Sequence, residues 1–194
     1  MQGEEREEGE PHEKIDAKGR NRGFTAIGVC HSLDMTEIVA AQQRAVSAME
    51  MFLRNFSKVP EERLHWQAAL GAKTPLRIAA HTALYAARFA EMMETRTLPQ
   101  PDNLEAWLAQ RNAEEEQITT RAEVEAIFRA GTAQVIAAMQ ELTAEDMDLI
   151  LESGQGWQMP MRFLVDLPAL HANLHCGQID FLQTCWGDQE VYVG

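Results

Sequence analysis

Apolar residues recur at intervals of three and four along most of the chain after residue 33. This is the spacing of one face of an α-helix, and its first stretch predicts an amphipathic helix over about residues 34–57. Asp34 followed three residues later by Glu37 has the pattern of a capping box, so we expect the helix to begin there. Pro60 follows its predicted end.

Two more long helices follow, each with its own start signal. A Thr-Pro pair predicts a helix over about residues 75–95, because threonine caps a helix and proline suits its first position. A second capping box, Thr120 with Glu123, predicts another helix over about residues 120–141. Both stretches carry apolar residues at helical spacing.

The last helix ends at Gly187 and contains a proline. Pro168 leaves two alternatives: it kinks a helix that starts near Met161, or it is an early residue of a helix capped by Asp166. Both alternatives place residues 170–186 on a helix.

Shorter elements connect the long helices. A short helix is expected at about residues 102–111, after the two prolines of LPQPDN, and a helical turn at about 143–151. There is no alternating strand pattern of useful length and no internal repeat. Four long amphipathic helices joined by a crossover predict an all-α, four-helix-bundle domain over residues 34–194.

The first 33 residues differ from the rest. They hold seven acidic and five basic residues and almost nothing apolar before Phe24, so we expect a flexible charged tail. Met35 stands close to the first helix signal and leaves two alternatives open. Either translation starts there, or the tail is a real extension.

The charge balance limits the classes of partner. The chain of 194 residues has 17 Lys and Arg against 30 Asp and Glu, a net charge of −13. Binding to nucleic acid or to an anionic membrane surface needs a basic stripe, which is missing. Three cysteines without a CxxC pair, no signal peptide and no membrane-spanning run favour the cytoplasm. The acidity favours a small-molecule, cation or protein partner and disfavours polyanionic substrates.

Three of the six histidines lie inside predicted helices. His171 and His175 are four residues apart, which places both imidazoles on one helix face about 6 Å from each other. His81 is in the middle of an alanine-rich helix, among apolar neighbours. Three imidazoles could bind a divalent metal and leave a position open for water or substrate. A histidine on an apolar face is more commonly a core residue, so spacing alone leaves both alternatives open.

Two segments resemble the DinB/YfiT-like superfamily. PEERLHWQAALGAKTPLRIAAHTALYAARFAEMM resembles the region in which a tryptophan precedes a helix with a metal histidine, and LHANLHCGQIDFLQTCWGD resembles the last helix, with its HxxxH pair. The resemblance covers about residues 35–188. It implies an up-and-down four-helix bundle with a crossover, commonly a homodimer. It also implies a divalent metal (Zn, Ni, Fe or Mn) on the residues that match its ligands, His81, His171 and His175.

Some neighbours of the motif histidines depart from the family pattern. Many members have a histidine before and an arginine after the last ligand, where this chain has Leu174 and Cys176. We expect Cys176 to be a small buried residue rather than a reactive thiol. Gln178 is expected either to hydrogen-bond a ligand or to pack between helices.

Other polar and aromatic candidates are weaker. Tyr85 could place its hydroxyl near a metal-bound water. Arg77 and Arg88 either steer a carboxylate or form surface salt bridges, and the acidic run at 112–117 is interpreted as a solvated face. Three tryptophans either line a pocket or cap the core: Trp66, Trp157 and Trp186.

The resulting hypothesis is a metal-dependent enzyme acting on a small molecule. A bound divalent ion would lower the pKa of water or bind a thiolate, and the resemblance narrows the reaction to hydrolysis or transfer to a low-molecular-weight thiol. No carboxylate is found a turn away from the ligands, and Asp180 is expected to point elsewhere. The competing hypothesis is a non-catalytic, stress-related protein that binds a metal or ligand.

Overall fold

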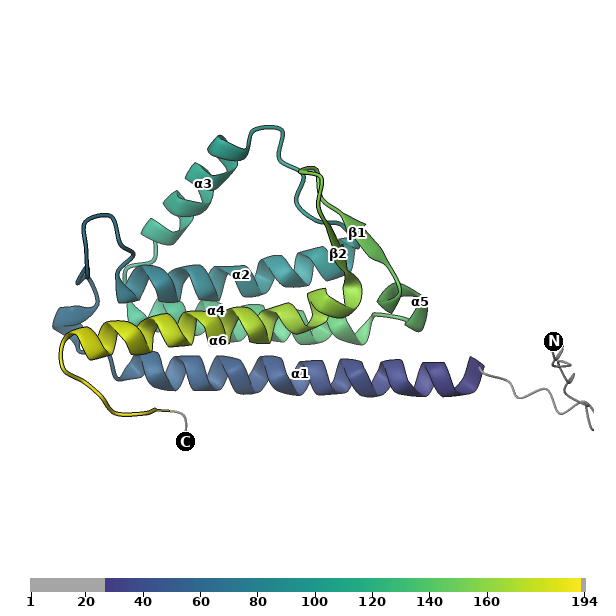
Figure 1. Cartoon of the computed structure of the whole chain (residues 1–194), viewed down its shortest axis with the longest axis horizontal. Helices are drawn as coiled ribbons and strands as arrows, with labels where there is room; N and C mark the ends of the chain where they lie inside the picture. The colour runs from purple at the N-terminus through teal and green to yellow at the C-terminus, as the bar shows by residue number, and fades with distance from the viewer. Residues whose placement is uncertain (1–26, 193–194) are drawn as a thin grey trace, which may run out of the picture.

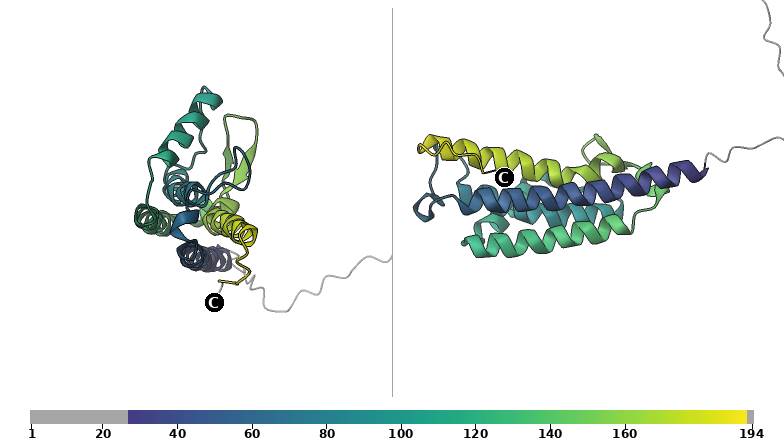
Figure 2. Two further views of the ribbon diagram at one scale, coloured as in Figure 1. Left: turned by 90° about the vertical axis from the view of Figure 1, so that its left-hand side faces the viewer. Right: turned by 90° about the horizontal axis from the view of Figure 1, so that it is seen from below.

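Four long helices lie side by side in the computed structural model, which describes residues 27–192 (Figure 1). They are α1 (Ile27–Ser57), α2 (Pro75–Thr95), α4 (Arg121–Gln140) and α6 (Met161–Cys185). Seen along the bundle, α2 contacts α4 and α6, and α1 contacts the same two helices (Figure 2). The predicted all-α fold class is confirmed.

The crossover between α2 and α4 carries a fifth helix, α3 (Leu104–Glu116). It returns the chain to the end of the bundle at which α2 begins, so α2 and α4 run in the same direction (Figure 1). The short helix predicted at 102–111 is present, but it ends at Glu116, five residues later than predicted. Its N-cap is Asn103, whose side chain accepts a hydrogen bond from the backbone N–H of Ala106 at 2.9 Å.

Helices α2 and α4 begin and end close to their predicted bounds, because local caps define them. Thr74 accepts the backbone N–H of Arg77 at 3.2 Å and Pro75 takes the first position of α2. Thr120 and Glu123 form the predicted reciprocal capping box at the start of α4.

The predicted start of the first helix is wrong. The backbone of α1 is already helical at Ile27, so Asp34 lies inside the helix and is not its N-cap. Of the predicted tail, residues 1–26 lie outside the described residues, and 27–33 form the first two turns of α1.

The last helix follows the first of its two alternatives. It starts at Met161 and continues through Pro168, while Asp166 pairs with Arg44 of α1 instead of capping a helix. Gly187, at φ +94°, ends it. The backbone N–H groups of Gly187 and Asp188 bond back to Thr184 and Gln183, at 3.1 Å each, as in a Schellman motif.

A small hairpin precedes α6. A single turn, α5 (Ala144–Met147), leads into β1 (Ile150–Glu152), which pairs antiparallel with β2 (Gln158–Pro160). The helical turn expected at 143–151 is thus shorter than predicted, and the strands were not predicted. Strands of three residues are too short to show an alternating pattern.

The core fills the space between the four long helices. Phe52, Met93, Met139, Leu164 and Ile179 are among its fully buried side chains. Gly131 allows α2 and α4 to approach closely, because a Cβ there would lie 2.9 Å from the Cβ of Ala86. By contrast, α3 contributes one buried residue, Glu115. Within the described part of the chain, no helix combines the length and hydropathy needed to cross a membrane.

Candidate metal centre

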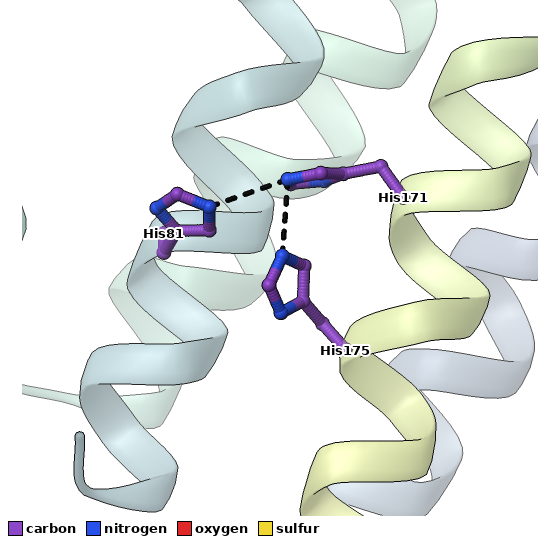
Figure 3. Close-up of side chains that lie close together, drawn as sticks. All are labelled: His81, His171 and His175. Atoms are coloured by element: carbon purple, nitrogen blue, oxygen red, sulfur yellow. Dashed lines mark hydrogen bonds between the residues drawn. The ribbon is translucent and has the colours of Figure 1, made fainter. Parts of the chain in front are cut away.

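The three predicted histidines meet in the space between α2 and α6 (Figure 3). His81 comes from the middle of α2, and His171 and His175 lie one turn apart on the facing side of α6. Nε2 of His171 is 3.3 Å from Nε2 of His81 and 3.1 Å from Nε2 of His175. We call these three residues the histidine triad.

The spacing of the three nitrogens suits a metal ion. Two nitrogens bound to a tetrahedral ion at about 2.1 Å each lie about 3.4 Å from one another. The ligand atoms of the triad all lie within 4.8 Å of one another. The group could therefore hold a divalent ion, and that it does so stays a prediction.

Two of the three rings are fixed from behind by acceptors. Nδ1 of His81 lies 2.7 Å from Oε1 of Glu115, and Nδ1 of His175 lies 2.7 Å from Oε1 of Gln178. Acceptors at Nδ1 place the ring proton there, so the lone pair of each Nε2 faces the centre of the triad. Of the two alternatives expected for Gln178, the structure shows the hydrogen bond to a predicted ligand, His175, and not packing between helices.

Glu115 is the residue at this site that the sequence interpretation missed. It belongs to the acidic run at 112–117, which was expected to be a solvated face, yet its side chain is only 2% exposed. Besides His81 it contacts Nζ of Lys73 at 2.8 Å and Nη2 of Arg77 at 3.2 Å. Lys73 lies just before α2 and Arg77 lies in its first turn. The opposite charges of these residues and the acidic run are the sequence signal that could have pointed to Glu115.

The charged partners keep Glu115 ionised. Burial alone would raise its pKa, but the hydrogen bonds from His81 and Lys73 outweigh burial and lower the pKa to about 2. The carboxylate therefore stays an acceptor for the ring of His81 at neutral pH.

The two histidines of α6 have lowered pKa values, which favour the neutral form. Burial and the neighbouring His175 and His81 lower the pKa of His171 to about 2. Burial also lowers the pKa of His175, against the opposing effect of its hydrogen bond to Gln178. Neutral imidazoles are the form that binds metals.

An aromatic wall covers one side of the triad. The ring of Tyr85 lies 4.4 Å from that of His81 and 5.1 Å from that of His171, between centroids, and the ring of Phe89 lies 5.3 Å from His171. Tyr85 thus packs its ring on two of the predicted ligands, and the arrangement does not test the predicted role of its hydroxyl.

Arg77 and Arg88, the two arginines of α2, form salt bridges, which is the second of the two alternatives expected for them. Arg77 pairs with Glu116 at 2.8 Å as well as with Glu115, and Arg88 pairs with Glu114 at 2.5 Å. All three acids belong to α3, so these pairs attach α3 to α2.

Residues beside the triad on α6 match their expected minor roles. Cys176 is buried and receives a hydrogen bond from Nδ2 of Asn55 at 3.2 Å, and burial raises the pKa of its thiol. Asp180 also accepts from Asn55, on the α1 side, and so points away from the triad. Leu174 is exposed.

The tryptophans divide between their two predicted roles. Trp66 and Trp186 make an edge-to-face contact, with centroids 5.5 Å apart, and pack against the core. Trp157, in the hairpin, lines a cavity instead.

Comparison with known proteins identifies the family. The family model of the DinB superfamily matches residues 37–179. No curated protein matches the sequence. Among solved structures, a DinB-like protein from Bacillus cereus superposes with a TM-score of 0.56 at 20% identity, over 78% of this chain and 95% of that one. A mutant of a mycothiol-dependent maleylpyruvate isomerase gives 0.56 at 15% identity, over 73% of this chain and 60% of the other. The chain therefore belongs to the DinB superfamily.

Proposed function

We propose that this protein is a metal-dependent enzyme in which His81, His171 and His175 hold a divalent cation. The observation that carries the proposal is the convergence of three Nε2 atoms, at 3.1 and 3.3 Å, from two facing helices. The Nε2 lone pairs of His81 and His175 face the same space, and a cation between them would relieve their repulsion. Three protein ligands also leave a position for substrate.

The reaction we favour is transfer of a low-molecular-weight thiol to an electrophilic small molecule. A divalent ion supplies Lewis acidity, which lowers the pKa of a coordinated thiol or water. A thiol, with a pKa of about 8.5, needs far less activation than water at about 15.7. The carboxylate that contacts the triad, Glu115, lies behind His81 and is engaged by Lys73 and Arg77, so it is not free to accept a proton from water.

A structural neighbour supports this choice. One of the solved structures reported above is described as mycothiol-dependent, which means that it uses a low-molecular-weight thiol. Hydrolysis by the same site is the second candidate reaction. A non-catalytic protein that sequesters a metal or ligand is the alternative from another class.

Metal analysis tests the site. We expect close to one divalent ion per purified chain, with most of it lost in His81→Ala and in His171→Ala. His65→Ala is the matched control, because His65 is exposed on the connection between α1 and α2. Metal content well below one ion per chain, together with unchanged melting of His81→Ala, would contradict the metal site.

Activity assays then separate the reactions. The metal-loaded protein is incubated with small electrophiles and a low-molecular-weight thiol, and in parallel with a panel of esters and amides. Thiol conjugates that are absent from His81→Ala support the favoured reaction, whereas ester or amide cleavage supports hydrolysis. If the protein binds metal but neither panel reacts, the non-catalytic alternative gains support.

We also propose that the protein is a homodimer through α6. Large apolar residues at helical spacing lie on one face of that helix, away from the core, and are all exposed: Phe163, Leu170, Leu174 and Phe181. We call them the α6 stripe. A second copy placed antiparallel across a twofold axis would match this stripe with itself, as in an isologous interface.

A further inference from the structure

An apolar cavity lies next to the aromatic wall of the triad. It has a volume of about 400 Å³ and is bounded by α2, the 98–101 segment, α3, the hairpin and the start of α6. The aromatic part of its lining consists of Tyr85, Phe89, Trp107 and Trp157. Its volume lies within the range of cavities that hold small organic ligands, about 300 to 1,000 Å³.

The lining carries no charge. Among its twelve residues, Gln155 and the hydroxyl of Tyr85 are the polar groups, and the rest are apolar or aromatic. The guanidinium groups of Arg88 and Arg111 lie over the rings of Tyr85 and Trp107 and share the carboxylate of Glu114. Neither arginine lines the cavity, so a charged ligand group inside it would have no charged partner among the lining residues.

Two residues connect the cavity with the triad. Tyr85 and Phe89 line the cavity and also contact the ring of His171, and Leu167 lines it one helical turn before His171. A molecule that fills the cavity therefore reaches the wall against which the triad packs.

We propose that this cavity binds the uncharged apolar part of the substrate, of about the size of a fused two-ring aromatic group, against the aromatic wall on which the triad packs. That the bound molecule is a substrate rests on the proposed function, whereas binding to the cavity does not. Apolar contact area and aromatic rings supply the affinity, and the absence of compensating charge selects against ionised analogues.

The experiment measures binding of 1-naphthalenemethanol by isothermal titration calorimetry, with 1-naphthoate as its charged counterpart. We expect saturable binding of the alcohol with a Kd below about 1 mM and at least tenfold weaker binding of the acid. Trp157→Ala and Leu104→Ala should each weaken binding of the alcohol several-fold. Both side chains are about half exposed, at 47% and 46%, so these variants should fold.

The matched control is Phe181→Ala, which removes an exposed aromatic ring from the α6 stripe and should leave binding unchanged. The proposal is overturned if the alcohol does not saturate, if the acid binds equally well, or if Trp157→Ala and Leu104→Ala bind like the wild type. His81→Ala should still bind the alcohol, because His81 does not line the cavity. Wild-type protein that binds the alcohol but contains no metal would retain the cavity and reject the metal site, whereas metal-loaded wild type that does not bind the alcohol would reject the cavity alone.

Discussion

Glu115 contacts the outer nitrogen of His81 while it remains almost completely buried. A buried carboxylate is costly unless it is paired, and here Lys73 and Arg77 supply the compensating charges. By accepting a hydrogen bond from Nδ1–H, Glu115 fixes the tautomer and the orientation of the ring and makes Nε2 more basic. Glu115 would therefore act as a positioning residue for a metal bound at the triad.

Replacing Glu115 by glutamine tests this role. Glu115→Gln keeps the size of the side chain but removes the charge, so metal affinity should fall about 10- to 100-fold. Competition with a chromophoric chelator measures this change. Glu116→Gln is the control, because Glu116 is a neighbouring acid whose side chain is 65% exposed. Equal affinities of the two variants would show that Glu115 does not support the site.

The grouping of the triad could be predicted from sequence, but its support could not. The four-residue spacing of His171 and His175 defines their common face, and the family resemblance adds His81. Glu115 is 34 residues from His81, in an acidic run that resembles a solvated face. Only the path of the crossover brings that run against the cations of α2, and no local pattern encodes this path.

At the scale of elements, α3 is unusual because charge attaches it to the bundle. Glu114, Glu115 and Glu116 pair with basic residues of α2 and the segment before it, while Glu115 is its one buried residue. Surface ion pairs are weakened by salt, whereas apolar packing is not. Hydrogen exchange of the α3 amides should therefore accelerate between low salt and about 0.5 M salt, while that of the α4 amides stays constant. Exchange in α3 that is independent of salt would contradict this account.

A second element, α5, depends on one carboxylate. Asp146 accepts from the backbone N–H of Thr143 at 2.9 Å and pairs with Arg96 at 2.9 Å, and these contacts lower its pKa, the hydrogen bond to Arg96 most of all. We expect Asp146→Asn to reduce the free energy of unfolding by about 1–2 kcal/mol at pH 7.

The pH dependence of this loss follows from the lowered pKa. The folded pKa of Asp146 lies below its unfolded value of about 3.9, so its stabilisation is complete above that value and declines as the pH falls towards the folded pKa. The difference in the free energy of unfolding between wild type and Asp146→Asn, measured by urea denaturation, should therefore begin to shrink below about pH 4 and should keep shrinking as the pH falls further. Glu145→Gln, at an exposed position of the same turn, should match the wild type at every pH.

Element bounds were predictable where a local cap defines them. Thr74 and Thr120 start α2 and α4 because their side chains bond the first backbone N–H groups. At Asp34 the same kind of pattern was misleading, because the helix continues on its N-terminal side. The strands of the hairpin depend on pairing across the turn between Glu152 and Gln158, which three-residue patterns do not reveal.

For the whole molecule, the α6 stripe predicts the state of association. Light scattering should give twice the 21.8 kDa of one chain for the wild type. Phe181→Glu should give a monomer, because a buried carboxylate without a partner costs more than the contact supplies. Leu70→Glu, at a fully exposed position off the stripe, should remain a dimer. A wild-type monomer would contradict the dimer.

The fold class was predictable from four amphipathic segments, because each must bury one face against the others. The cavity was not, since its lining comes from α2, α3, the hairpin, α6 and a connecting segment. Each of these residues looks like an ordinary core or surface residue in its own element, and only the assembled chain brings them around one space.

The position of α3 has a thermodynamic consequence. One end of this helix supplies Glu115 to the triad, and the other supplies Leu104 and Trp107 to the cavity. A ligand that prefers the docked helix, whether a metal ion at one end or an apolar molecule at the other, must shift the helix towards the docked state. Linkage is reciprocal, so each ligand then raises the affinity for the other by the same factor. The crossover helix α3 is thus also the element that can couple binding at the triad to binding in the cavity.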